Sequence, residues 1–229
     1  MVNNKYQDLW LVVAAYNEDQ VILDVLKNVL QHFPNVVVVD DGSTDNTISD
    51  ICLTSAYCIP HPINLGQGAA LKTGIDFALS KGAKYISTFD ADGQHSIDDV
   101  KAMYTLISKE DTDVILGSRF LGKAVGITKF RRVFLKAAAL FTGVTSGVWL
   151  TDAHNGLRMF NDKAAYLMDI RQNRMSHASE IISLIGINKL RYIEAPVTIT
   201  YTEYSIAKGQ KLSNSVSILI DQFMSKFIR

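Results

Sequence analysis

The stretch NVVVVDDGSTDNT, residues 35–47, joins four consecutive valines to two aspartates and then to turn-forming residues. An unbroken β-branched run predicts a strand that is buried on both faces, as in a parallel sheet. Gly42 permits a tight turn after it. Ser43 or Asp45 can then cap a helix, which we expect near residues 46–54. A buried strand followed by a short turn and a helix is the repeating unit of a parallel α/β fold.

The same alternation continues on both sides of this stretch. Apolar runs predict further strands at residues 9–15, 56–61, 84–90 and 113–118. Apolar periodicity and flanking glycines predict helices at residues 19–33, 66–82 and 96–108. Strands that alternate with helices are joined by right-handed crossovers. We therefore expect a Rossmann-like, mostly parallel sheet with helices on both faces.

The composition is that of an ordinary soluble globular protein. Hydrophobic residues make up 48% of the chain, charged residues make up 20%, and the formal net charge is zero. No global field therefore attracts nucleic acid, and any electrostatic partner must meet a local patch. Cys52 and Cys58 lack metal or redox spacing, which indicates reduced thiols of a cytosolic protein. The N-terminus lacks signal-peptide features, and the glycines and hydroxyls of residues 133–150 make that apolar segment a poor membrane span.

Polar residues follow four of the predicted strands. The carboxyl ends of parallel strands share one edge of a sheet, and ligands of α/β proteins bind outside that edge. We therefore expect these polar residues to converge on one site. They are Tyr16–Glu18, Asp40–Asp41, Asp90–Asp92 and Ser118–Arg119.

The acidic pair in DADGQH, residues 90–95, is a candidate metal site. Asp90 and Asp92 repel each other unless a cation lies between them, and oxygen ligands suit Mg²⁺ or Mn²⁺. Gln94 can add a neutral oxygen, and His95 a further contact. The same stretch precedes a predicted helix and can serve as its N-terminal cap. The pair alone does not decide between these interpretations.

Two other stretches carry candidate ligand-binding residues. Asp40 and Asp41 leave the end of a buried strand, where a carboxylate can hold a ribose hydroxyl or a base N–H. Lys72 lies in the glycine-rich helix 66–82 and can face an anion. Neither a P-loop nor a dinucleotide fingerprint is present there, and close helix packing explains the small residues equally well.

Residues 119–151 contain six basic residues and no acidic residue. Arg119 ends the fifth predicted strand, so its guanidinium would reach the ligand edge and pair with phosphate oxygens. Arg131 and Arg132 lead an apolar helix. A solvated basic face is the ordinary explanation of such residues, but the absence of acids favours an anionic, lipid-like partner.

Five motifs together resemble a known family. They are AAYNE (14–18), VVDDGSTDNT (38–47), GAALKTG (68–74), DADGQH (90–95) and GSRF (117–120). Through them the chain resembles the inverting family-two glycosyltransferases with a GT-A fold over roughly residues 9–170, and its FDADGQH and GSRF are most similar to the dolichyl- and polyprenyl-phosphate sugar synthases. The resemblance implies a single GT-A domain over residues 1–211, with a nucleotide-sugar half to about residue 118 and an acceptor half from about residue 119. Residues 212–229 would form an amphipathic terminal helix.

The resemblance also implies roles for single residues. Asp90, Asp92 and Gln94 would hold a Mg²⁺ or Mn²⁺ ion that bridges the diphosphate. Arg119 with Arg131 or Arg132 would bind phosphates of donor and acceptor. The donor nucleotide would be bound by Ala15, Asn17, Glu18, Asp40, Asp41, Lys72 and Ala91.

Two further segments are similar to acceptor-side elements of the family. DAHNGLRMF, residues 152–160, is similar to the motif D-x-x-S-G-F-R-x-F and departs from it at Asn155 and Leu157. The segment YTEYSIAKGQK occupies the position of a basic loop that covers the site in related synthases. The candidate acceptor-binding residues of that loop are Ser205, Lys208 and Lys211.

These features predict transfer of a sugar, with inversion, from a nucleotide diphosphate donor to a polyprenyl phosphate for cell-envelope glycan assembly. UDP-glucose and UDP-N-acetylglucosamine are favoured over GDP-mannose. A phosphate acceptor is already anionic at neutral pH and needs no strong base. If the acceptor is instead a hydroxyl of a glycan or lipid, Asp152 is the candidate base. A non-catalytic regulator that binds nucleotide sugars is the alternative from another class.

The lipid acceptor has consequences for location. We expect a cytoplasmic protein, peripheral on the inner face of the cell membrane, with a helix within residues 130–150 and the terminal helix at the bilayer surface. A small membrane-protein partner is a further expectation, and nucleic acid is not an expected partner.

Overall fold

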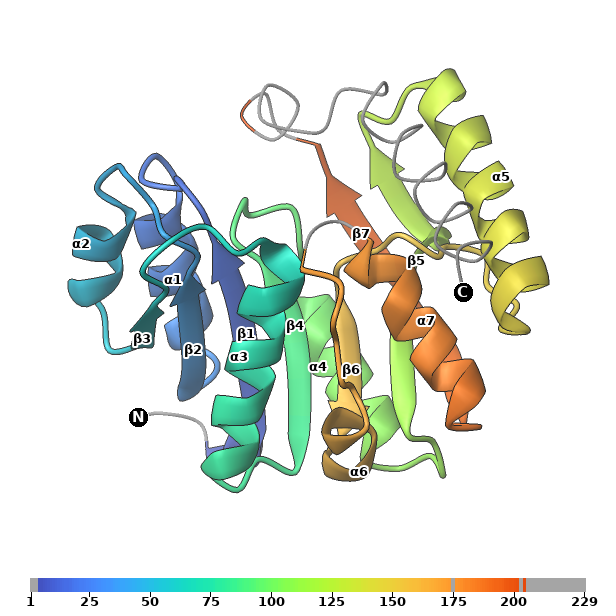
Figure 1. The fold of residues 1–229 in the computed structure, drawn as a ribbon, viewed down its shortest axis with the longest axis horizontal. Helices are drawn as coiled ribbons and strands as arrows, with labels where there is room; N and C mark the ends of the chain where they lie inside the picture. The colour runs from blue at the N-terminus through green and yellow to red at the C-terminus, as the bar shows by residue number, and fades with distance from the viewer. Residues whose placement is uncertain (1–3, 174–175, 202–203, 205–229) are drawn as a thin grey trace.

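One sheet at the centre of the fold joins both halves of the chain (Figure 1). The structure is a computed structural model, and it describes residues 4–173, 176–201 and 204. Within these residues the sheet has seven strands in the order β3-β2-β1-β4-β6-β5-β7. The strands are β1 (Leu9–Ala15), β2 (Asn35–Asp40), β3 (Tyr57–Pro60), β4 (Tyr85–Asp90), β5 (Val114–Val125), β6 (Arg158–Asn161) and β7 (Tyr192–Thr200).

Helices cover both faces of this sheet (Figure 1). α1 and α4 pack on one face, and α3, α6 and α7 pack on the other, with α5 beside α7. The predicted α/β fold with a mostly parallel, helix-flanked sheet is confirmed. The helices are α1 (Ile22–Leu30), α2 (Thr47–Cys52), α3 (Gln67–Ser80), α4 (Ile97–Ile107), α5 (Lys129–Ser146), α6 (Asp162–Tyr166) and α7 (His177–Ile187).

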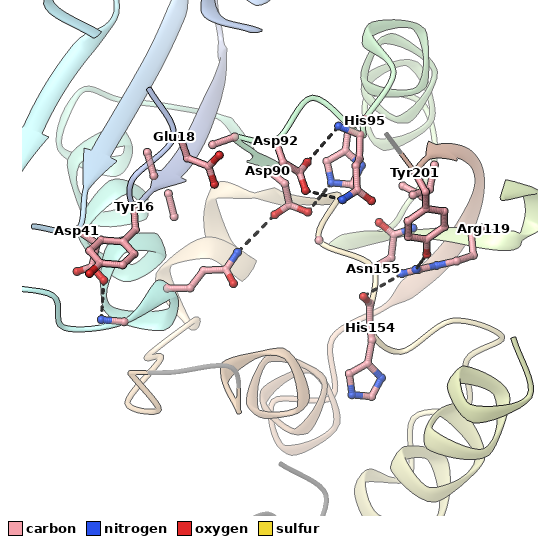
Figure 2. A pocket seen from close by; sticks show the side chains of 18 of the residues that line it. Tyr16, Glu18, Asp41, Asp90, Asp92, His95, Arg119, His154, Asn155 and Tyr201 are labelled. Carbon is pink, nitrogen blue, oxygen red and sulfur yellow. Dashed lines mark hydrogen bonds and ion pairs between the residues drawn. The ribbon is translucent and has the colours of Figure 1, made fainter. Parts of the chain in front are cut away.

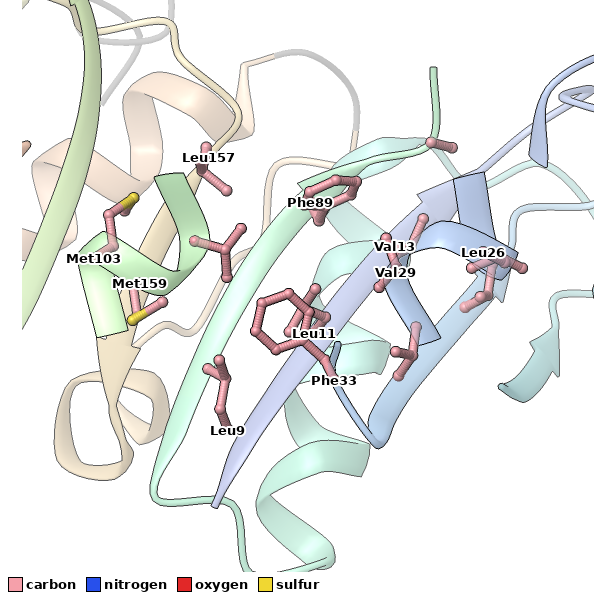
Figure 3. Packing of buried hydrophobic residues seen from close by; sticks show 14 of the residues in the cluster. Leu9, Leu11, Val13, Leu26, Val29, Phe33, Phe89, Met103, Leu157 and Met159 are labelled. Carbon is pink, nitrogen blue, oxygen red and sulfur yellow. The ribbon is translucent and has the colours of Figure 1, made fainter. Parts of the chain in front are cut away.

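The central strand β1 shows why its sequence is apolar throughout. Leu9, Leu11 and Val13 point to one face, where they pack with Phe33 and with residues of α1 and α4 (Figure 3). The alternating residues Trp10 and Val12 point to the opposite face and pack against α3. A strand that is buried on both faces has no solvent-facing positions, so its sequence has no polar alternation.

Sequence reasoning missed β6, as it missed the helices α6 and α7. This four-residue strand lies between β4 and β5 and runs antiparallel to both of them, with Arg158 opposite Thr88 and Leu116. An antiparallel strand begins at the edge where its parallel neighbours end. The loop that precedes β6, residues 152–157, is therefore brought to the same edge as the ends of β4 and β5.

The basic segment after β5 forms the long helix α5. Thr128 caps it by accepting a hydrogen bond from the backbone N–H of Arg131 (3.3 Å), and Gly147 ends it in the left-handed conformation at φ 75°. In the part of the chain that the structure describes, no helix is long and apolar enough to cross a membrane. The predicted terminal helix 212–229 and the loop residues Ser205, Lys208 and Lys211 lie outside the described residues.

Candidate active site

A pocket of about 550 Å³ lies at the carboxyl edge of the sheet (Figure 2). Residues that follow β1, β2 and β4 line it, together with residues of β5, β7, α5 and the 152–157 loop. The predicted convergence of the strand ends on one site is therefore confirmed. The predicted site residues that line the pocket are Ala15, Glu18, Asp41, Asp90, Ala91, Asp92, Gln94, Arg119 and Arg131.

Asn17 and Asp40 shape the loops behind the pocket wall. Asp40 accepts a hydrogen bond from the backbone N–H of Ser43 (3.0 Å) and a short one from the Ser43 hydroxyl. Asn17 has a positive φ of 53°, and its side-chain oxygen accepts a hydrogen bond from the N–H of Thr44 (2.8 Å). The Ser43 hydroxyl also accepts the backbone N–H of Asn17 (2.8 Å), so these residues together tie the loop after β1 to the loop after β2.

Three other predicted residues are not among those that line the pocket in the described part of the chain. Lys72 forms an ion pair with Asp76 one helical turn away, with 2.5 Å between Nζ and Oδ2. Arg132 is exposed on α5. Asp152 is buried behind the wall and contacts Arg119. The structure thus brings the first two to the molecular surface and the third to a supporting position.

Asp41 organises the loop that leads into α3. Its Oδ1 accepts the backbone N–H of Leu65 (3.0 Å) and contacts His61 Nδ1 (2.8 Å), while its Oδ2 accepts the N–H of Gly66 (2.6 Å). A Cβ on Gly42 would lie 2.6 Å from the backbone of Ile63, so the turn after β2 passes directly against this loop. Asp41 therefore holds the loop in place at the β1–β2 end of the pocket.

Asp90 is held by neighbouring side chains. Its Oδ2 lies 2.8 Å from His95 Nε2, and its Oδ1 accepts a long hydrogen bond of 3.4 Å from Gln67. Burial raises the pKa of Asp90, but the adjacent His95, the guanidinium of Arg158 and the nearby His177 together bring that pKa below its usual value. Asp90 is therefore a fixed anion in the floor of the pocket.

Asp92 has the opposite electrostatic character. Burial, and then the negative charge of Asp90, raise the pKa of Asp92 to about 6. The backbone N–H of Gln94 (3.1 Å) and its side-chain amide (2.5 Å) donate to the two oxygens of Asp92 and offset only part of this rise. A positive charge beside Asp92 would relieve the repulsion between the two carboxylates.

Arg119 is fixed by three partners. Its Nε donates to Asp152 Oδ2 (2.6 Å), one terminal nitrogen donates to the Tyr201 hydroxyl (2.6 Å), and the other donates to the backbone carbonyl of His154 (2.9 Å). Burial lowers the pKa of Arg119, but the charge of Asp152 and the interactions with Tyr201 together outweigh this effect and raise it. The guanidinium is therefore a permanent, oriented cation in the pocket wall.

Tyr201 joins this arginine to a second one. The guanidinium carbon of Arg131 lies 4.8 Å from the centre of the Tyr201 ring, while the hydroxyl of the same ring accepts from Arg119. Arg119 and Arg131 lie on β5 and α5, so the end of β7 brings them to the same wall. Tyr201 was not among the predicted site residues, because its pattern is that of an ordinary strand residue.

The loop before β6 supplies the other residues that sequence reasoning left without a role. His154, Asn155 and Gly156 line the pocket. Burial lowers the pKa of His154 to about 4, so its imidazole is neutral. Burial also lowers the pKa of Arg158, at the start of β6, to about 10, although Asp90 and Asp152 act to raise it. The similarity of DAHNGLRMF to an acceptor-side motif was the available signal for this loop.

The comparisons with known proteins agree with this geometry. Residues 10–167 match the model of the family described as Glycosyl transferase family 2. The chain belongs to this family. The resemblance predicted from five motifs is thereby confirmed. The pocket of this family-2 glycosyltransferase lies inside the matched region, apart from Ile199 and Tyr201.

Two curated relatives cover nearly the whole chain. An uncharacterized protein of Methanocaldococcus jannaschii is 35% identical and covers 96% of this chain and 92% of its own length. The UDP-N-acetylglucosamine–dolichyl-phosphate N-acetylglucosaminyltransferase of Methanococcus voltae is 31% identical, over 95% of this chain and 96% of its own length. A polyprenol monophosphomannose synthase of Mycolicibacterium smegmatis is 26% identical, over 86% of this chain and 79% of its own length.

Solved structures share the fold. The glucosyl-3-phosphoglycerate synthase of Mycobacterium tuberculosis, in complex with Mn²⁺ and UDP-glucose, superimposes with a TM-score of 0.67. The match covers 95% of this chain and 78% of that chain at 16% sequence identity. This likeness confirms the GT-A fold of the family-2 glycosyltransferase.

Proposed function

We propose that this family-2 glycosyltransferase transfers a sugar from a nucleotide diphosphate sugar to a polyprenyl phosphate, with inversion at the anomeric carbon. The observation that carries the proposal is that one pocket holds a carboxylate pair and an arginine pair; Figure 2 shows the two carboxylates and Arg119. Asp90 and Asp92 suit the cation-bridged diphosphate of a donor, and Arg119 and Arg131 suit the phosphate of an acceptor. The names of relatives that act on dolichyl phosphate and polyprenol support the same acceptor class.

The donor nucleotide would occupy the β1–β2 end of the pocket. Ala15, Glu18 and Asp41 line this end, and the loop held by Asp41 adds Asn64. Ligands of doubly wound sheets bind outside the carboxyl ends of the parallel strands, which is the edge where this pocket lies. UDP-N-acetylglucosamine is the first donor to test because it is named in the 31% identical relative, and UDP-glucose is the second.

The oxygen-bearing side chains at the carboxylate end of the pocket fit a divalent cation. Among the described residues, no group of three or more His, Cys, Asp or Glu side chains could enclose a metal alone. Mg²⁺ and Mn²⁺ are commonly held by one or two carboxylates, with substrate phosphate oxygens completing the shell. Asp92 and Gln94 would hold the ion, with Asp90 fixed behind them by His95. When bound, the ion would neutralise the charge of the diphosphate leaving group.

The acceptor phosphate would lie against Arg119 and Arg131. One of its oxygens attacks the anomeric carbon as the bond from that carbon to the diphosphate oxygen breaks, and the diphosphate leaves with the electron pair. The phosphate monoester carries about −1.5 to −2 charge at pH 7, so no protein base has to remove a proton. A hydroxyl acceptor would need such a base, and Asp152 is already committed to Arg119 (2.6 Å). Positioning and charge therefore supply the catalysis.

A lipid-linked acceptor requires contact with a membrane surface, and α5 has a suitable face. Apolar side chains that are 61–69% exposed lie at helical spacing along it: Phe130, Val133, Leu140 and Val144. Basic residues flank them: Lys129, Arg132 and Lys136. An apolar stripe beside basic residues is typical of helices that lie in the interface of an anionic bilayer. The protein would then act at the cytoplasmic face of the cell membrane.

The function is tested by incubating the protein with Mn²⁺, a polyprenyl phosphate and a panel of UDP- and GDP-sugars, with acid-labile glycolipid as the readout. We expect product from one donor, its loss in Asp92→Asn, and its retention in Asp98→Asn, which changes an exposed carboxylate on α4. Nucleotide binding without turnover for any acceptor would instead favour a nucleotide-sugar-binding regulator. Flotation with protein-free vesicles tests whether a separate membrane protein is needed for membrane contact.

A further inference from the structure

The side-chain amide of Asn155 is buried without a complete set of partners. Asn155 is 3% exposed, yet its Nδ2 has no hydrogen-bond partner among the described residues. Buried polar groups in folded proteins are nearly always paired, and an unpaired donor in a pocket is a natural contact for a ligand. Asn155 is one of the residues that line the pocket, so this unpaired amide lies in the pocket wall.

The backbone fixes the direction in which the amide points. Asn155 Oδ1 accepts a hydrogen bond from the N–H of Leu157 (3.0 Å). Exchanging the oxygen and nitrogen would place two donors face to face and lose this bond. The NH₂ group is therefore the part of the side chain left to face a ligand.

The neighbours of Asn155 place it between the two charged groups of the site. The carbonyl of His154, one residue before, accepts from Arg119 (2.9 Å), and a Cβ on Gly156, one residue after, would lie 2.2 Å from a carboxylate oxygen of Asp90. Figure 2 accordingly shows Asn155 between the aspartates and Arg119. If the diphosphate lies at the carboxylates and the acceptor phosphate at the arginine, the transferred sugar lies beside Asn155.

We propose that Asn155 recognises the donor sugar. Its NH₂ group would donate a hydrogen bond to a carbonyl oxygen on the substituent beside the anomeric carbon, as in a 2-acetamido sugar. An amide NH₂ can only donate and a carbonyl oxygen can only accept, whereas a sugar hydroxyl also brings a donor that needs its own partner. The phosphates already have charged partners, so a neutral donor suits the uncharged sugar. This inference rests on the proposed function.

The test compares two donors that differ only in this substituent, UDP-N-acetylglucosamine and UDP-glucose. Asn155→Ser removes the amide without adding charge. We expect this variant to lower kcat/KM for UDP-N-acetylglucosamine by about tenfold or more and to leave kcat/KM for UDP-glucose within about threefold. The affinity for UDP alone should not change. Asn28→Ser, on the exposed side of α1, is the matched control.

Three results would overturn the assignment: equal loss with both donors, equal use of both donors by the unaltered protein, or a rise confined to the KM for polyprenyl phosphate, which would assign the amide to the acceptor. Calorimetry separates this inference from the proposed function. If the protein makes no glycolipid with any donor, the proposed function fails. The inference then stands only if the protein binds UDP-N-acetylglucosamine more tightly than UDP-glucose and Asn155→Ser removes the difference.

Discussion

The two ends of the pocket balance their charges in different ways. At the arginine end, Arg119 is paired with Asp152 and also donates to Tyr201 and to a backbone carbonyl. At the carboxylate end, burial and then the negative charge of Asp90 raise the pKa of Asp92 to about 6, and no cation among the described residues is paired with Asp92. The arginine end is complete as folded, whereas the carboxylate end carries a repulsion that a bound cation would remove. The comparison predicts opposite effects for mutations at the two ends.

The largest effect is expected from Arg119→Met. Removing the guanidinium leaves Asp152 buried without its cation, which should lower the free energy of unfolding by about 3–5 kcal/mol. The variant should also lose about 10²–10³ in kcat/KM, because the cation that we propose as a phosphate ligand is gone. Urea denaturation and steady-state kinetics measure the two effects, with the exposed Arg132→Met as the control.

A double variant sharpens this prediction. Arg119→Met with Asp152→Asn removes both charges, so most of the stability should return while the activity remains low. If activity returned together with stability, Arg119 would be a structural residue and the arginine end would have no direct part in the reaction.

The next largest effect is expected from Asp92→Asn, which should raise the free energy of unfolding rather than lower it. The pKa of Asp92 is about 6 when folded, above the value of about 3.9 for an unfolded chain, so the folded protein binds this proton more tightly. Ionised Asp92 therefore costs stability above about pH 6, and the cost fades as the pH falls towards 4. Asp92→Asn should raise the free energy of unfolding by about 1–3 kcal/mol at pH 7.5 in a chelator and by almost nothing at pH 4.

Asp98→Asn is the matched control for this pH dependence, because Asp98 is an exposed aspartate on α4. A gain in Asp92→Asn that was the same at both pH values would mean that repulsion between the carboxylates is not its source. Adding Mn²⁺ and UDP should reverse the order of stability, because the unaltered protein would then bind a cation that the variant has lost.

The smallest effect is expected from Tyr201→Phe. The ring remains beside Arg131, and only the hydroxyl that accepts from Arg119 is lost. Loss of one hydrogen bond should lower kcat/KM by about five- to tenfold and change stability by about 1 kcal/mol. Tyr201→Ala, which also removes the ring, should cost more. Equal losses in the two variants would contradict a separate role for the hydroxyl. The exposed Tyr166→Phe is the control.

The two ends also differ in how well they could be predicted. Asp90, Asp92, Gln94 and His95 interact within six residues of chain, so one motif and the end of one apolar run located them. Arg119 was predicted as a phosphate ligand, but its partners lie 33 and 82 residues away, and no local pattern identifies them. The contacts of Asp152 and Tyr201 with Arg119 are therefore known only from the tertiary structure.

The sequence by itself determined the alternation of strands and helices, the mostly parallel sheet and the edge at which the site forms. These follow from local causes, since buried strands must be apolar and parallel strands share their carboxyl edge. Only the tertiary structure decided that β6 inserts antiparallel between β4 and β5, a pairing of Thr88 with Arg158 across 70 residues. A four-residue strand has too few residues to show a period, and its position depends on partners far along the chain. That insertion brings Asn155 and Gly156 to the pocket wall beside the carboxylates and the arginine.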